Sequence, residues 1–202
     1  MNQDLIVIGG SAGGLEAVTQ IVRDLPKDLP AAVFVVLHLV PTYPSAIARL
    51  LDRAGDLPAF HPRDGQKIRH RNIYVAPPDR HLLIEGNVVR VLKGPSENLH
   101  RPAIDPLFRS AAFYGRSRVA GILLTGADMD GTAGLFSIKM RHGVTIVQDP
   151  QEALVPLMPG SALKHVEIDY KLRLREMPPL IDRLARGRLG RGPKEGGSSV
   201  AV

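Results

Sequence analysis

The hydrophobic residues of this 202-residue chain gather in short continuous runs, which alternate with segments whose apolar positions have helical spacing. Runs without polar interruption are typical of strands that are buried on both faces of a sheet. The chain has such runs at residues 5–9, 31–38 and 119–124, and a further predicted strand at residues 144–148, where Thr145 interrupts the apolar residues. Helices are predicted at residues 13–24, 44–54, 104–115, 132–142, 159–165 and 178–186. This alternation predicts an α/β fold, a three-layer α/β/α domain with a mostly parallel, doubly wound sheet.

The middle of the chain, residues 58–100, departs from this rhythm and is rich in proline, glycine and histidine. It holds three short β-like runs, at residues 72–76, 81–84 and 88–92. The residues between the last two runs, Glu85-Gly86-Asn87, are typical of a hairpin turn. We therefore expect a short antiparallel excursion from the main sheet.

Composition narrows the possible function classes. The chain has no cysteine, which excludes disulfides and thiolate metal sites. It has no apolar run of about twenty residues and no signal-peptide pattern, so we expect a cytoplasmic protein without membrane insertion. The net charge is +6, but aromatic residues make up only 4%, which argues against a nucleic-acid partner. We expect one domain over residues 1–186, a disordered basic Gly/Ser-rich tail over residues 187–202, and neither a cofactor nor a metal.

The segment IVIGGSAGG (6–14) predicts a strand, a glycine-crowded turn with Ser11 at its apex, and the start of a helix. Residues 9–13 fit the G-x-S-x-G nucleophile elbow, which exposes the serine hydroxyl next to the positive end of a helix. Residues 9–14 also fit the dinucleotide-binding G-x-G-x-x-G, with serine in place of the second glycine. The turn by itself leaves both interpretations open.

Polar residues at the ends of two further predicted strands add a base and an acid. His38 ends the second strand, where a dinucleotide site would need a ribose-binding carboxylate. Asp128 and Asp130 both follow the third strand. Because the carboxyl ends of parallel strands meet at one edge of a sheet, we expect Ser11, His38 and one of these carboxylates to lie together. A serine nucleophile needs a base, and the imidazole needs a carboxylate, so the pattern favours a serine hydrolase.

Several motifs in register carry a resemblance to a known family. They are IVIGGSAGG (6–14), HLVP (38–41), IYVAPPDRHL (73–82), HRPAIDPLFRSAA (100–112), LLTGADMDGTAGL (123–135), and TIVQDP with MPGSA downstream. Over nearly residues 4–185 the chain resembles the catalytic domain of the chemotaxis protein-glutamate methylesterase (CheB) family. The resemblance implies a three-layer α/β/α fold and hydrolysis of glutamate γ-methyl esters on chemoreceptor helices. Methanol is the implied product, and deamidation of receptor glutamines is a second implied activity.

The resemblance also implies roles for individual residues. Ser11 matches the nucleophile, His38 the general base, and Asp130 the acid that orients the base. The amide of Ala127 matches a position that helps to stabilise the oxyanion. Ala12, which follows the nucleophile, is a second candidate for oxyanion or substrate binding.

Three features depart from the family pattern. The family often has Leu-Thr-Gly-Met-Gly before the acid, whereas here Ala127 replaces the methionine and Asp128 replaces the glycine. Asp128 thereby gains a lesser claim to be the acid. Ala12 stands where threonine is common. The sequence lacks the usual receiver domain, so we expect activity without a phosphodonor.

The implied partners are methylated chemoreceptor helices and, as a further candidate, a separate response-regulator protein. Arg101 precedes the predicted helix over 104–115 and is expected to contact a carboxylate-rich receptor surface. The histidines at positions 61, 70, 81, 142 and 165 lack metal-ligand spacing and are expected to be structural or surface residues. Two rival functions stay open: a catalytically impaired binding module of the same fold, and a dinucleotide-binding oxidoreductase.

Overall fold

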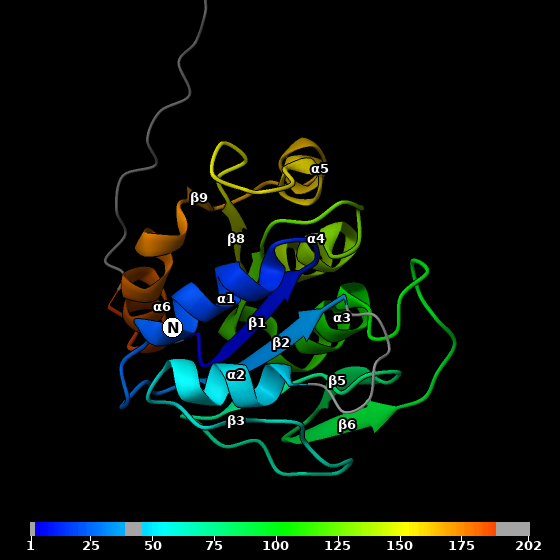
Figure 1. The fold of residues 1–202 in the computed structure, drawn as a ribbon, viewed down its shortest axis with the longest axis vertical. Helices are drawn as coiled ribbons and strands as arrows, with labels where there is room; N and C mark the ends of the chain where they lie inside the picture. The colour runs from blue at the N-terminus through cyan, green and yellow to red at the C-terminus, as the bar shows by residue number, and fades with distance from the viewer. Residues whose placement is uncertain (1–2, 39–45, 189–202) are drawn as a thin grey trace, which may run out of the picture.

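A seven-stranded parallel sheet crosses the centre of the molecule in the computed structural model, which describes residues 3–38 and 46–188 (Figure 1). The strand order is β3-β4-β2-β1-β7-β8-β9. The strands are β1 (Leu5–Gly10), β2 (Ala32–Leu37), β3 (Ala59–Phe60), β4 (Ile73–Val75), β7 (Val119–Leu123), β8 (Val144–Gln148) and β9 (Tyr170–Leu172). The predicted parallel α/β architecture is confirmed.

Helices cover both faces of this sheet (Figure 1). They are α1 (Gly14–Arg23), α2 (Ile47–Ala54), α3 (Ile104–Gly115), α4 (Thr132–Met140), α5 (Leu157–His165) and α6 (Met177–Ala185). One apolar cluster joins the sheet to α1, α2 and α6, and a second joins it to α3, α4 and α5. Ile6 and Ile8 belong to the first cluster and Leu5 and Val7 to the second, because successive strand side chains point to opposite faces. Burial on both faces explains the unbroken apolar runs of the sequence.

The middle of the chain agrees with the sequence prediction in part. Strands β5 (His81–Glu85) and β6 (Val88–Leu92) form the expected antiparallel hairpin, which packs against α3. The run over residues 72–76 forms a strand as predicted, β4, but this strand pairs in parallel with β2 and β3 and belongs to the main sheet, not to the antiparallel excursion. All three residues of β4 are buried, as a strand covered on both faces requires.

Parts of three predictions lie outside the described residues. The predicted helix over 44–54 is described from Ile47 onward, and most of the HLVP motif falls in residues 39–45. Nearly all of the predicted tail falls in residues 189–202. In the described part of the chain, none of the helices combines the length and the apolar character needed to cross a bilayer.

The order of the strands creates a switch point in the sheet. From β1 the chain builds β2, β3 and β4 on one side and then crosses back to build β7, β8 and β9 on the other. In open parallel sheets, ligands bind beyond the carboxyl ends of the strands where the direction of winding reverses. Ser11, His38 and the segment holding Asp128 and Asp130 follow β1, β2 and β7 at this point.

Candidate active site

Ser11 follows β1 in a turn that is built from backbone contacts. Its amide donates to the carbonyl of Thr125 (2.9 Å), and its own carbonyl accepts from the amide of Gly14 (2.8 Å). Gly13 precedes α1 with a φ of +77°, a left-handed conformation that glycine adopts without strain. Since α1 begins at Gly14, the positive end of the helix lies beside the serine.

The end of β7 is pressed against this turn. The hydroxyl of Thr125 donates to the carbonyl of Ala12 (2.9 Å). A Cβ atom on Gly126 would lie 2.9 Å from the Cβ of Ser11 and 2.6 Å from the Cε of Met158, closer than real Cβ atoms approach. Only glycine fits at position 126 without a shift of these neighbours, so the loop after β7 lies directly against Ser11.

His38 reaches the same edge of the sheet from β2. Strands β1 and β2 pair with Gly10 opposite Leu37, and the amide of His38 donates to the carbonyl of Gly10 (3.2 Å). The His38 side chain is 5% exposed, and its Nε2 lies 2.8 Å from an oxygen of the fully buried Asp130 carboxylate. The predicted juxtaposition of a base and an acid at this edge is therefore present in the structure.

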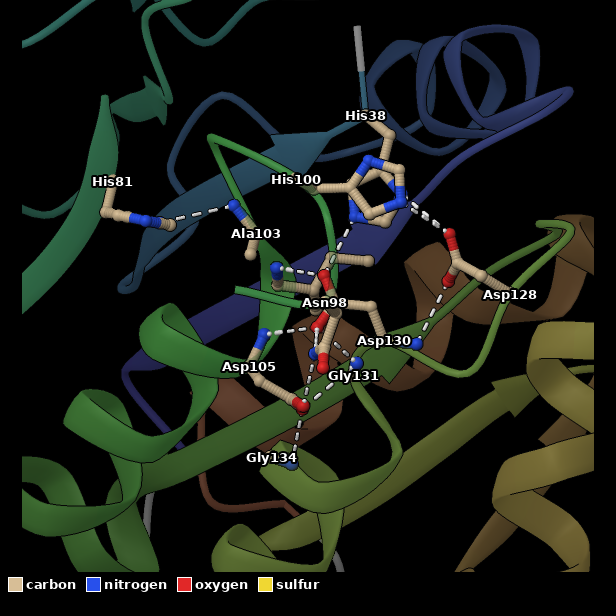
Figure 2. A network of polar contacts seen from close by, with 11 residues as sticks. His38, His81, Asn98, His100, Ala103, Asp105, Asp128, Asp130, Gly131 and Gly134 are labelled. Atoms are coloured by element: carbon tan, nitrogen blue, oxygen red, sulfur yellow. Dashed lines mark hydrogen bonds and ion pairs between the residues drawn. The ribbon is translucent and has the colours of Figure 1, made fainter. Parts of the chain in front are cut away.

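The Asp130 carboxylate is held at the start of α3 (Figure 2). The amides of Ile104 and Asp105 donate to its two oxygens, over 2.6 and 3.1 Å. The side-chain amide of Asn98 donates to it over 2.7 Å. Burial alone would raise the pKa of Asp130, but the hydrogen bonds from His38, Ile104 and Asn98 outweigh burial and lower the pKa.

The Asp105 carboxylate accepts amides at the start of α4, as the Asp130 carboxylate does at the start of α3. One oxygen of its carboxylate accepts the amides of Gly131 (3.0 Å) and Gly134 (2.7 Å), and the other accepts the side-chain amide of Asn98 (2.9 Å). Burial, and then the charge of Asp130, raise the pKa of Asp105. Asn98 thus joins two buried carboxylates, each of which holds the first amides of a different helix (Figure 2).

A second histidine and a second carboxylate adjoin His38. The ring of His100 stacks on that of His38 with centroids 3.5 Å apart and 9° between the planes. One oxygen of Asp128 lies 3.1 Å from Nδ1 of His38 and 2.9 Å from Nε2 of His100. Its other oxygen accepts the amide of Asp130 (2.9 Å). Among the described residues, Nδ1 of His38 is buried without a partner in hydrogen-bond geometry.

The contacts of Ser11, Ala12 and Ala127 show which parts of the predicted serine site are in place. Within residues 3–38 and 46–188, no hydrogen bond joins the Ser11 hydroxyl to His38. Ala12 and Ala127 are exposed, on the turn after β1 and on the loop after β7. Their amides donate to no acceptor in the described part of the chain, so both are free to meet a ligand.

Arg101 lies beside the site but is engaged elsewhere. Its guanidinium donates to the carboxylate of Asp79 through Nε (2.7 Å) and Nη2, and to the carbonyl of Gly94 through Nη1 (2.8 Å). Its contact with a receptor surface stays a prediction. Asn98 is a site residue that no sequence pattern predicts, because its partners lie 7 and 32 positions away in the chain. Asp105 lies at the start of the predicted helix over 104–115, and no local pattern distinguishes it from other carboxylates in the first turn of a helix.

Comparison with known proteins agrees with this geometry. The family model for the CheB methylesterase matches residues 6–181. This chain belongs to the CheB methylesterase family. A crystal structure of the Thermotoga maritima CheB methylesterase catalytic domain superimposes with a TM-score of 0.85 at 31% identity, covering 91% of this chain and all of that one. The fold and the family expected from the sequence are thereby confirmed.

Two curated relatives of different length carry nearly the same name. A Leptospira interrogans protein, "Putative protein-glutamate methylesterase/protein-glutamine glutaminase", is 36% identical over 94% of this chain and 98% of its own length. An Anaeromyxobacter dehalogenans protein, "Protein-glutamate methylesterase/protein-glutamine glutaminase 2", is 36% identical over 91% of this chain but only 54% of its own length. The chain therefore corresponds to nearly the whole of the first relative and about half of the second.

Proposed function

We propose that this chain acts in the cytoplasm as a protein-glutamate methylesterase on chemoreceptor proteins, with Ser11 as the nucleophile. Membership of the CheB methylesterase family and the names of its relatives support this activity. The observation that carries the proposal is the buried contact of His38 with Asp130, over 2.8 Å, at the sheet edge where the Ser11 turn also lies. Glutamine deamidation would follow the same route, with ammonia leaving instead of methanol.

The proposed base is the Nδ1 atom of His38. The lowered pKa of Asp130 keeps its carboxylate ionised at neutral pH, so the carboxylate accepts a proton held on Nε2. In a neutral imidazole the other nitrogen then carries a free lone pair. In a serine–histidine–aspartate triad, the ring nitrogen that is not bonded to the carboxylate takes the serine proton, and here that nitrogen is Nδ1. Catalytic hydrogen bonds often tighten only when substrate binds, so the serine hydroxyl is expected to turn toward Nδ1 in the complex.

The chemical steps follow from these positions. The oxygen of Ser11 attacks the ester carbonyl while His38 takes its proton, and the amides of Ala12 and Ala127 donate to the oxyanion. The tetrahedral intermediate collapses to an acyl-enzyme, and methanol leaves with the proton from His38. Water then attacks the acyl carbonyl with His38 again as base. Cleavage of the bond to Ser11 releases the glutamate side chain and restores the serine.

A groove of about 600 Å³ beside Asp130 supports a protein substrate. It is lined by Leu99, Met129 and Phe136, whose exposed fractions are 97%, 65% and 51%. Large apolar side chains exposed together are typical of surfaces that bind another protein. A receptor helix lying in this groove would bury them and bring a methylated glutamate close to Ser11.

A serine-directed organophosphonate tests the nucleophile directly. The full chain should gain one adduct by intact-mass measurement, located on Ser11 by peptide mapping, and should release methanol from a methylated receptor fragment. The variant Ser137→Ala, on the exposed face of α4, is the matched control and should behave like wild type. An unlabelled chain that still binds the receptor fragment would instead identify a binding module without turnover.

A further inference from the structure

Three side chains of types that can bind a metal ion lie close together at this sheet edge. His38 follows β2, His100 precedes α3, and Asp128 follows β7. One nitrogen or oxygen atom from each lies within 4.8 Å of the other two. The two imidazole rings are stacked, and both turn a nitrogen toward the same carboxylate oxygen, which Figure 2 shows. The proposed esterase mechanism uses one of these three residues and leaves the other two without a role.

A cation would stabilise the contact between His38 and Asp128. Since Nε2 of His38 bonds to Asp130, the neutral ring presents the lone pair of Nδ1 to a carboxylate oxygen only 3.1 Å away. Two electron-rich atoms repel each other at that distance unless a positive charge lies between or beside them. A proton on Nδ1 would form an ion pair with Asp128 over 3.1 Å, but without hydrogen-bond geometry. A metal ion bound by both atoms would satisfy them together.

We propose that Nδ1 of His38, Nε2 of His100 and a carboxylate oxygen of Asp128 bind a divalent transition metal such as Zn²⁺. Imidazole nitrogen with carboxylate oxygen suits Zn²⁺, Ni²⁺ or Cu²⁺, whereas Mg²⁺ and Ca²⁺ prefer oxygen ligands alone. Two ligands at about 2.0–2.1 Å from a tetrahedral zinc lie roughly 3.3 Å apart, slightly beyond the present spacing. The two nitrogen–oxygen distances are 3.1 and 2.9 Å here. Because the stacked rings are nearly parallel, they cannot both direct an in-plane lone pair at one ion, so the ring of His100 has to tilt out of the stack when the metal binds. The side chains of His100 and Asp128 are each about one-third exposed, which leaves room for this movement.

The surroundings of two ligands match those of known metal sites. A histidine ligand usually donates its second ring N–H to a carboxylate, which fixes the tautomer and raises the basicity of the metal-bound nitrogen. Nε2 of His38 has this partner in Asp130. The second oxygen of Asp128 accepts the amide of Asp130 over 2.9 Å, which holds that carboxylate in place as well. Three protein ligands leave a fourth position of a tetrahedral metal for water or substrate.

The consequence for activity rests on the proposed function. The metal would take the lone pair of Nδ1, which is the atom that must accept the proton of Ser11. Metal binding and ester hydrolysis therefore compete for one nitrogen, and the metal acts as a reversible inhibitor. Methanol release should fall when Zn²⁺ is added and recover when a chelator removes it.

Metal binding is tested on the chelator-treated full chain, with Co²⁺ followed by visible absorption and Zn²⁺ by titration calorimetry. Wild type should bind one ion per chain, and Asp128→Ala and His100→Ala should weaken binding at least about tenfold. Asp128→Asn provides a second variant if alanine impairs folding, which circular dichroism reports. Asp24→Ala, which removes an exposed carboxylate at the end of α1, is the matched control and should bind like wild type.

Each result decides one part of the proposal. Absence of stoichiometric binding, or equal affinity in wild type and Asp128→Ala, would overturn the metal site. Stoichiometric binding with undiminished methanol release would overturn the competition and keep the site. The Ser11→Ala variant should still bind the metal, because the serine is not a ligand. A wild-type chain that binds metal but never releases methanol, even with a chelator, would overturn the proposed esterase function alone.

Discussion

The Ser11 turn and the carboxylate network of Asp130 and Asp105 solve the same task in different ways. Each fixes a polar group at the start of a helix. At the turn, backbone atoms do this: Ser11 is held by its own amide and carbonyl, and its hydroxyl makes no hydrogen bond among the residues that the structure describes. In the network, side chains do it, because the carboxylates of Asp130 and Asp105 accept the first amides of α3 and α4.

At the Ser11 turn, activity can therefore be lost without loss of stability. In the carboxylate network, a substitution affects activity and stability together. A side chain that holds no backbone can be changed for the sake of activity without cost to the fold. A buried carboxylate with several donors cannot, because its loss leaves those donors without an acceptor. Substitutions in the two regions should therefore change turnover and stability in different proportions, and four predictions test this comparison.

The largest effect is expected for Ser11→Ala. Loss of the nucleophile should lower methanol release by at least about 10⁴-fold, whereas the free energy of unfolding should change by less than about 0.5 kcal/mol. Methanol release and urea unfolding on the same samples give both numbers. A destabilised variant would show that the hydroxyl also supports the turn. A variant with more than about a tenth of wild-type turnover would remove Ser11 from the mechanism.

Asp130→Asn should affect both quantities. Turnover should fall by about 10⁴-fold, because the amide no longer stabilises a charged His38 or its tautomer. Stability should fall by about 1–3 kcal/mol, because the donors from Ile104, Asp105 and Asn98 share a weaker acceptor. Asp128→Asn is the comparison, and its turnover should fall far less. The reverse order of the two variants would give the role of the acid to Asp128.

The same contrast explains what the sequence could predict. The Ser11 turn could be predicted because its strand, glycines, serine and helix are contiguous in the sequence, although its contacts with Thr125 and Gly126 could not. His38 and Asp130 were found through a rule about strand ends, which holds because the sheet is parallel. Strand β4 was predicted as a strand, but its parallel pairing was not, since a short β-like run does not specify whether its partner is parallel or antiparallel.

The carboxylate network could not be predicted from the sequence, for a different reason. Asn98 lies in a loop without regular structure, and its two bonds depend on how α3 and the loop after β7 pack together. The stacking of His100 on His38 likewise joins residues 62 positions apart in the chain. Such contacts are properties of the folded molecule, because no local pattern of residue types encodes them.

Asn98→Gly should have an intermediate effect and isolate the network from the nucleophile. Asn98 has a φ of +50°, and glycine preserves that conformation while removing the donor shared by two carboxylates. Stability should fall by about 1–3 kcal/mol, measured by urea unfolding. Labelling of Ser11 by the organophosphonate should slow but persist. Unchanged stability would mean that the bridge between Asp105 and Asp130 contributes nothing to the fold.

The smallest effect concerns the pKa of Asp105, which is raised above 3.8 first by burial and then by the charge of Asp130. Asp130→Asn removes the charge but not the burial, so this pKa should fall only part of the way toward 3.8. Carboxyl carbon chemical shifts followed against pH measure it.

Stability should follow the opposite pKa shift of Asp130. Since the unfolded chain takes up the Asp130 proton at higher pH, wild type should lose unfolding free energy as pH falls below 3.8. The variant should lack this loss, and an unchanged acid profile would show that Asp130 is not held as a buried carboxylate.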